Sequence, residues 1–199
     1  MNHLAHVFLS FRDPDLLAGN LMTDFMKGKP AIDHLPEGIQ KGIYLHRQID
    51  QFTDQHAVVK QSKQRLYAHF GKYASVVVDI YFDHLLAINW ANYEKEQLQD
   101  FVNASYDMLL ENIQWMPPVL KRRLPEMIGH NWLARYANLH DMDRTFYYLS
   151  KRAKFENQLD KGAEVLAAHL DAFNEEFLAF FPELIQHSQE SLETFSNPK

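Results

Sequence analysis

Apolar side chains recur along this chain at the three- and four-residue intervals of amphipathic helices, and strict alternation of apolar and polar residues is rare. The leucine, isoleucine, valine and phenylalanine positions define separate helical stretches. From the N-terminal side these stretches cover residues 14–28, 37 to a bend at 53–56, 58–70, 75–93, 94–116, 119–136, 142–152 and 155–191. The pattern therefore predicts an all-α protein.

Residues with special backbone preferences mark the ends of these stretches. Asp13 is a good N-cap, and Pro14 suits the first turn of a helix. Two prolines mark residues 29–37 as a loop. Pro125 is expected to kink or divide its helix, and residues 197–199 read as a tail.

The chain shows no repeat and no composition shift that would divide it. Its 199 residues, 46% of them hydrophobic and 13% aromatic, are enough for one core. We therefore predict one helical bundle spanning residues 1–199. The chain has no cysteine, so disulfides and zinc–thiolate sites are excluded.

Charge and hydropathy argue against two kinds of partner. The net charge of −6 argues against a nucleic-acid binder, whose affinity rests on a basic surface. No apolar run reaches the length of a membrane span, and the first residues lack the features of a secretory signal. We expect a soluble, cytoplasmic protein without a membrane partner.

One stretch, residues 42–54, carries a regular series of groups that could bind a metal. His46, Asp50 and Asp54 follow one another at four-residue intervals, which places them along one stripe of a helix. An imidazole one turn from a carboxylate can hold a divalent cation or share a proton with it. Arg47 is next to His46 and could face a phosphate.

Further acids lie in helices that are otherwise apolar. Asp79 and Asp83 share one face of the most apolar stretch, and Asp24 interrupts another. A carboxylate buried without a partner costs several kcal/mol or more, so it must protonate, pair with a base or hold a cation. Carboxylates with some imidazole suit Mn²⁺ or Mg²⁺, and also Fe²⁺.

Each of these features also has a purely structural interpretation. His46 and Asp50 could be an ordinary pair on a helix surface, and Asp83 with His84 a satisfied pair in the core. Asp24 could bond the end of a neighbouring helix, and His6 could be a core histidine. Because the acids come from three separate apolar helices, we favour one shared site.

Two basic clusters occur later in the chain, at residues 121–123 and 151–154. A solvated helix end is the simpler interpretation. The alternative is a docking surface for an acidic protein.

Several short motifs follow one another along the chain. They are Asn2-x-Leu-Ala-His6, Gly19-Asn20-x-x-x-Asp24-Phe25, Gly42-x-x-x-His46-Arg47-x-Ile49-Asp50, Thr53-Asp54 and Asp79-x-x-x-Asp83-His84. In their residues and order, over nearly the full length of the chain, they resemble the acyl carrier protein phosphodiesterase family. The resemblance implies an all-helical fold like that of HD-type metal phosphohydrolases. It also implies release of 4′-phosphopantetheine from holo acyl carrier protein with a divalent cation, usually Mn²⁺.

The resemblance assigns expected roles to individual residues. We expect the metal ligands to be His6, Asp24, His46, Asp50 and Asp83. Asp79 or His84 would orient the attacking water, and Arg47 would offset charge on the phosphate. The expected substrate-binding residues are Asn20, Arg122, Arg123 and Arg152. One departure is that the HD signature has His before Asp, whereas Asp83-His84 is reversed.

Two other functions remain compatible with the same residues. A metal phosphohydrolase could act on a nucleotide or another small phosphodiester. A non-catalytic helical module could bind a carrier protein, with the acids serving as structural pairs; its melting would then not respond to EDTA.

Overall fold

The computed structural model describes residues 1–28 and 30–196 of the chain. Helices and loops make up this part, with no strand, which confirms the predicted all-α class. Lys29, in the predicted loop, and the predicted tail at 197–199 lie outside the described residues.

The helices follow one another with short connections. The α-helices are α1 (His3–Phe8), α2 (Pro14–Met22), α3 (Glu37–Gln55), α4 (Ala57–Phe70), α5 (Ala74–Ile88), α6 (Leu98–Glu111), α7 (Pro118–Gly129), α8 (Leu139–Arg152), α9 (Gly162–Ala168) and α10 (Leu170–Ser196). Short 3-10 segments between them are η1 (Thr23–Phe25), η2 (Gly71–Tyr73), η3 (Trp90–Asn92), η4 (Ile113–Trp115), η5 (Ala134–Ala137) and η6 (Leu159–Lys161).

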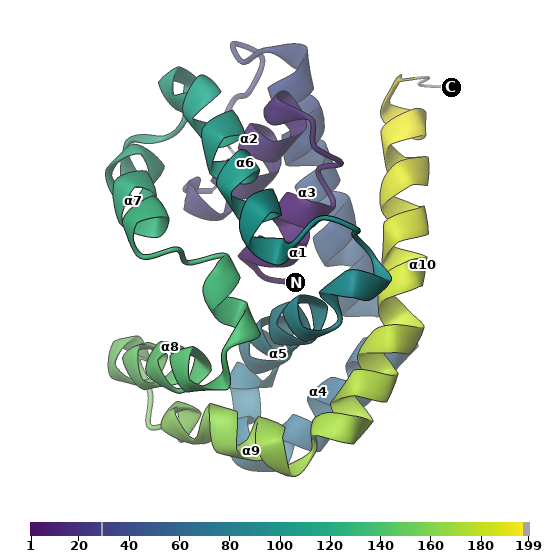
Figure 1. Ribbon diagram of the computed structural model, residues 1–199, viewed down its shortest axis with the longest axis vertical. Helices are drawn as coiled ribbons and strands as arrows, with labels where there is room; N and C mark the ends of the chain where they lie inside the picture. The colour runs from purple at the N-terminus through teal and green to yellow at the C-terminus, as the bar shows by residue number, and fades with distance from the viewer. Residues whose placement is uncertain (29, 197–199) are drawn as a thin grey trace.

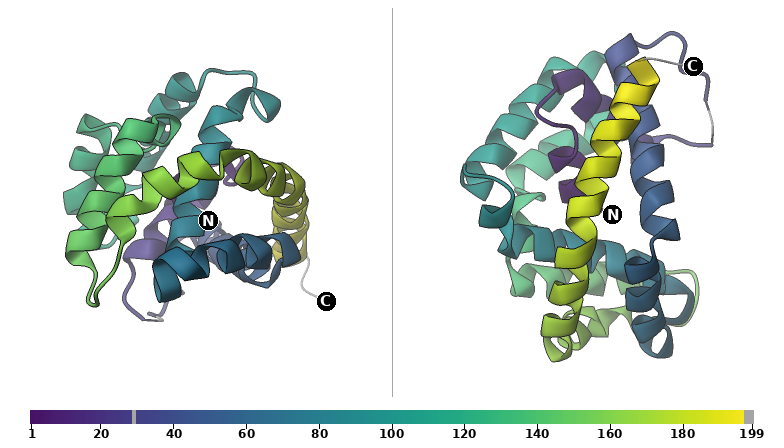
Figure 2. Two further views of the ribbon diagram at one scale, coloured as in Figure 1. Left: turned by 90° about the horizontal axis from the view of Figure 1, so that it is seen from below. Right: turned by 90° about the vertical axis from the view of Figure 1, so that its right-hand side faces the viewer.

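Figure 1 shows α10 along one side of the molecule, α6 and α7 at the upper left, and α8 and α9 at the lower end. In the right-hand view of Figure 2, α10 runs nearly the whole length of the molecule. It packs against α3, α4 and α5. The short α1 packs against α2 and α5, so its residues lie among the central helices.

Phenylalanines of α10 and aromatic residues of α5 form much of the core. Phe173, Phe177 and Phe180 are fully buried, as are Tyr81 and Phe82 of α5. Ring pairs between the two helices have centroids 5.1 to 5.7 Å apart, and several meet edge to face. This core packs α5 against α10 on one side, and the N-terminal α1 packs on α5 as well.

Helices α2 and α3 cross at two glycines, and this crossing brings the two halves of the site together. A Cβ atom on Gly19 would lie 2.1 Å from the Ile39 carbonyl oxygen, and one on Gly42 would lie 2.3 Å from that of Leu16. Only glycine permits so close an approach of the two backbones. Asn20 is thereby placed directly beside the helix that carries His46.

Several helix ends differ from the sequence pattern by a few residues, and three larger departures have physical reasons. The six-residue α1 was not predicted, because it is too short for a periodic pattern. The expected helix over 155–191 is divided into η6, α9 and α10, since α9 packs on α8 whereas α10 packs on α3 to α5. Helix α7 continues past Pro125 and ends at Gly129, before η5.

Helix-capping predictions agree with the structure at α2. The Asp13 side chain accepts hydrogen bonds from the backbone N–H groups of Asp15 and Leu16 at 2.9 and 3.0 Å.

Within residues 1–28 and 30–196, no helix combines the length and apolar character that crossing a bilayer requires.

Candidate metal centre

Side chains from three elements converge where α1 meets the middle of α3. His6 comes from α1, His46 and Asp50 come from α3, and Asp24 comes from η1. One ligand atom each from His6, His46 and Asp50 lie within 4.8 Å of one another. The Nε2 atom of His46 also lies 3.6 Å from Oδ1 of Asp24. The structure thus brings together four of the five expected metal ligands.

Asn20 fixes the proton on the inner nitrogen of both imidazoles. Its amide nitrogen donates to the His6 carbonyl (2.9 Å) and to the Ser10 hydroxyl (3.1 Å), so its Oδ1 atom accepts from Nδ1 of His6 at 2.8 Å. The backbone carbonyl of Asn20 accepts from Nδ1 of His46 at 2.9 Å. When the rings are neutral, both Nε2 atoms therefore carry lone pairs.

Those lone pairs face carboxylate oxygens, which is unfavourable unless a positive species lies between them. The Nε2 atom of His46 is 3.1 Å from Oδ2 of Asp50, and that of His6 is 3.3 Å from Oδ1. Protonating both rings would stack two imidazolium ions with centroids 4.1 Å apart. Burial, reinforced by the neighbouring His46, lowers the pKa of His6 to about 4. A divalent cation satisfies every lone pair at once, so this donor set fits a metal.

The carboxylates make the centre accessible from outside, while the imidazoles lie behind them. The Asp50 and Asp24 side chains are 48% and 36% exposed, whereas those of His6 and His46 are almost fully buried. Burial opposes ionisation of Asp50, but His46 and His6, when their Nε2 atoms carry protons, outweigh it and hold the pKa of Asp50 well below its usual range. An ion held here could therefore contact water and an external substrate.

His3 adds a second imidazole beside Asp24 that the sequence analysis did not single out. Its Nδ1 atom lies 3.1 Å from Oδ2 of Asp24. Burial opposes ionisation of Asp24, but the hydrogen bond from His3 outweighs it and lowers the pKa of the carboxyl. The only sequence signal was the spacing of His3 and His6, one turn apart in a short helix.

Asp79 and Asp83 have partners in the N-terminal segment. Asp83 is fully buried, and its two oxygens accept from the backbone N–H groups of Asn2 (3.0 Å) and Leu4 (2.6 Å). Asp79 pairs with the N-terminal ammonium group of Met1 at 3.0 Å. Both acids thus hold the start of α1 against α5, whereas Asp83 was expected to bind the metal and Asp79 to orient the attacking water.

The remaining expected catalytic residues also have identifiable positions. His84 donates from Nδ1 to the carbonyl of Tyr136 at 2.6 Å, which ties α5 to η5. Arg47 is exposed on α3, one residue after His46. Asp54 pairs with Lys63 of α4 at 2.7 Å, so the stripe on α3 contributes only its first two members to the centre.

A cleft next to the metal centre contains two of the expected substrate-binding arginines. Its volume is about 580 Å³, and its lining includes Arg123 of α7 and Arg152 of α8 together with Asn2 and His3. Arg122, although exposed, is not part of this lining. Asn20 was expected to bind substrate, but its side chain is fully buried behind the imidazoles and does not face the cleft.

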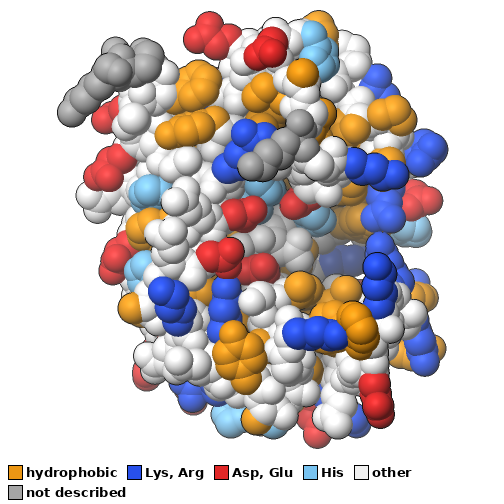
Figure 3. Space-filling model, turned by 180° about the vertical axis from the view of Figure 1, so that it is seen from behind, with side chains coloured by type: hydrophobic (Ala, Val, Ile, Leu, Met, Phe, Trp, Pro, Cys, Tyr) orange, Lys and Arg blue, Asp and Glu red, His pale blue; other side chains and the backbone are white. Residues whose placement is uncertain are grey.

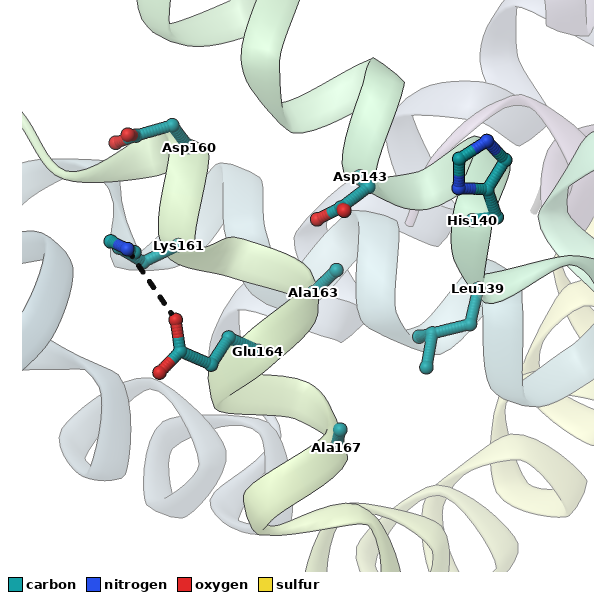
Figure 4. A pocket seen from close by; sticks show the side chains of 8 residues that line it. All are labelled: Leu139, His140, Asp143, Asp160, Lys161, Ala163, Glu164 and Ala167. Carbon is teal, nitrogen blue, oxygen red and sulfur yellow. Dashed lines mark ion pairs between the residues drawn. The ribbon is translucent and has the colours of Figure 1, made fainter.

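Another hollow, of about 440 Å³, lies between α8 and the segment formed by η6 and α9 (Figure 4). Asp143, Asp160 and Glu164 contribute carboxylates to it, and Lys161 pairs with Glu164 at 3.6 Å. The negative charge of this hollow would repel a phosphate, and none of the metal-centre residues His6, Asp24, His46 and Asp50 lines it.

Fold and centre together define an all-α protein with a candidate metal site of two imidazoles and carboxylate ligands. The sequence profile described as acyl carrier protein phosphodiesterase matches residues 1–184. The chain therefore belongs to this family, as the motifs had indicated.

Individual proteins named acyl carrier protein phosphodiesterase are similar to this chain over nearly their whole length. An acyl carrier protein phosphodiesterase of Salmonella agona (strain SL483) is 30% identical over 186 residues, which cover 93% of this chain and 96% of the relative. One from Klebsiella pneumoniae (strain 342) is 29% identical over 187 residues, covering 94% and 96%. No solved structure matches the chain significantly, so the expected likeness to HD-type hydrolases stays a prediction.

Proposed function

We propose that this protein is a metal-dependent phosphodiesterase that releases 4′-phosphopantetheine from holo acyl carrier protein. Family membership and the names of the relatives support the substrate. The observation that carries the chemistry is the convergence of the His6 and His46 lone pairs on the Asp50 carboxylate. Such a donor set is what a hydrolytic metal centre needs.

His6, His46 and Asp50 would hold the cation, with Asp24 beside it. A divalent ion bound there would lower the pKa of a water ligand and polarise the phosphoryl oxygens. Mn²⁺ is our choice because it accepts both imidazole and carboxylate ligands; Mg²⁺ and Fe²⁺ are the other ions to test. Asn20 keeps both rings in the tautomer that presents Nε2, which is the orienting role that outer hydrogen bonds have in metal sites.

The other polar residues divide between proton transfer, charge neutralisation and support. Asp24 is our candidate to accept the proton of the attacking water because it lies beside the proposed ion, with its Oδ1 atom 3.6 Å from Nε2 of His46. Arg47 remains the candidate to offset charge on the phosphate. We assign structural roles to Asp79 and His84, because Asp79 pairs with the Met1 ammonium group and His84 donates to the Tyr136 carbonyl.

The test compares two aspartates on one helix. Release of 4′-phosphopantetheine from holo carrier protein is measured with Mn²⁺ and with EDTA. Asp50→Ala removes a ligand, so activity with Mn²⁺ is expected to fall at least about 100-fold, more than an outer-shell change costs. Asp54→Ala is the control, because this exposed residue only pairs with Lys63 and should stay within about twofold of wild type.

Two outcomes would contradict the proposal. Wild-type protein with Mn²⁺ that leaves holo carrier protein intact would exclude the activity. Undiminished release by Asp50→Ala would separate the activity from this centre.

A further inference from the structure

The cleft of about 580 Å³ lies between the N-terminal segment and α5, η5, α7 and α8, and Asn2 and His3 belong to its lining. The Nδ1 atom of His3 lies 3.1 Å from Oδ2 of Asp24, so His3 connects the cleft to the metal centre. The volume falls within the range of roughly 300–1,000 Å³ that is typical of binding pockets.

Arginine side chains dominate the charge of this cleft. Arg123, Arg135, Arg144 and Arg152 line it, against the single carboxylate of Asp141. Among the described residues, none of these four arginines forms an ion pair, although Arg144 also lies over the Tyr148 ring at 5.8 Å. Uncompensated guanidinium groups from three elements favour an anionic partner. This local charge is opposite to the net charge of −6 of the whole chain.

Apolar side chains lie between the arginines. Val76 and Tyr148 are 41% and 54% exposed, and Trp132 and Leu149 are half-buried. Figure 3 shows the corresponding pattern: Lys and Arg side chains, with hydrophobic ones among them, surround a hollow on one side of this face, next to a central group of Asp and Glu. A free phosphate would use only the charges, whereas an acidic amphipathic helix would use both.

We propose that this cleft binds an acidic amphipathic helix of the carrier protein, that is, its polypeptide and not its pantetheine arm. The inference rests on the proposed function, because it needs a carrier protein as substrate. Apolar residues of that helix would contact Val76, Trp132 and Leu149, and its carboxylates would meet the arginines. The serine that carries the phosphate would then lie near His3, at the entrance to the metal centre.

The experiment uses charge reversal on the full-length protein with bound Mn²⁺. Arg152→Glu changes an exposed cleft residue, and Lys60→Glu changes an exposed residue of α4 with no cleft contact. Both binding of apo carrier protein, by calorimetric titration, and steady-state release from holo carrier protein are measured. We expect Arg152→Glu to weaken apo-carrier binding and raise KM about tenfold with kcat nearly unchanged, because uniform binding is lost. Lys60→Glu should leave both values near wild type.

A second comparison distinguishes the cleft from general positive charge on α7. Arg123→Glu, inside the cleft, is expected to weaken apo-carrier binding more than Arg122→Glu, its neighbour outside it. Equal effects of these two variants would overturn the inference. Wild-type binding and KM in Arg152→Glu would also overturn the inference. An effect of Arg152→Glu on binding of holo but not apo carrier protein would overturn it too, because the cleft would then bind the pantetheine arm.

The outcomes also separate this inference from the proposed function. Arm release by wild type with no effect of Arg152→Glu would leave the function standing and exclude the docking site. No arm release by wild type would exclude the function, whatever the carrier protein binds.

Discussion

The close approach of α2 and α3 at Gly19 and Gly42 allows one substitution to test how packing controls the metal centre. Gly42→Ala adds a single Cβ atom on α3. It would lie 2.3 Å from the Leu16 carbonyl oxygen and 2.9 Å from the backbone nitrogen of Asn20. Both neighbours are backbone atoms that cannot rotate away, so the two helices must separate by about 1 Å to restore ordinary contact.

The cost of that separation can be bounded from the packing. Overpacking of a well-packed core costs typically about 1–3 kcal/mol, and the rigid backbone at this crossing favours the upper value. For a chain of this size about 3 kcal/mol corresponds to a fall in Tm of roughly 6–12 °C. The same shift would lengthen the 2.9 Å hydrogen bond from His46 to the Asn20 carbonyl, and loss of such a bond typically weakens metal binding about 10- to 100-fold.

The assay is thermal melting in EDTA together with Mn²⁺ titration of the folded protein at 25 °C. Gly129→Ala is the control, because a Cβ atom there meets nothing within 4 Å, and it should leave both values close to wild type. A Gly42→Ala protein that melts and binds Mn²⁺ like wild type would refute the argument that this crossing aligns the site.

Two further perturbations test single contacts. Asn20→Ala removes the Oδ1 acceptor of His6, so the Kd for Mn²⁺ in a titration should rise about 10- to 100-fold; an unchanged Kd would mean that the tautomer is fixed otherwise. Burial raises the pKa of Asp83 to about 7 from 3.8, so between these values the native state holds a proton that the unfolded state has lost. The contribution of Asp83 to the free energy of unfolding therefore falls by about 3 kcal/mol as the pH rises from 5 to 8. Urea unfolding of wild type and Asp83→Asn should show this fall in their difference, and a constant difference would contradict it.

The sequence pattern was sufficient for the fold class and for one half of the centre. His46 and Asp50 are one turn apart on a long amphipathic helix, so their proximity follows from helix geometry alone. Asp24 could be selected because a carboxylate is unusual in an apolar segment. These local signals do not depend on how the helices pack.

The other half of the centre depends on tertiary contacts that no local pattern encodes. Asp83 satisfied the same criterion as Asp24, yet it accepts hydrogen bonds from the first turn of α1, a helix too short to predict. The position of Asn20 behind both imidazoles follows from the crossing of α2 and α3 at Gly19 and Gly42. The sequence indicated that certain polar residues would be buried, but it did not indicate which groups would form hydrogen bonds with them.

In the proposed centre, the lone pairs of His6 and His46 and the Asp50 carboxylate would surround a divalent cation. Anomalous diffraction at the manganese edge, from crystals grown with Mn²⁺, tests it most directly. We predict one strong peak bonded to both Nε2 atoms and to Asp50, which is absent from Asp50→Ala crystals. A wild-type crystal with no peak there, or with manganese bound only elsewhere, would contradict the account.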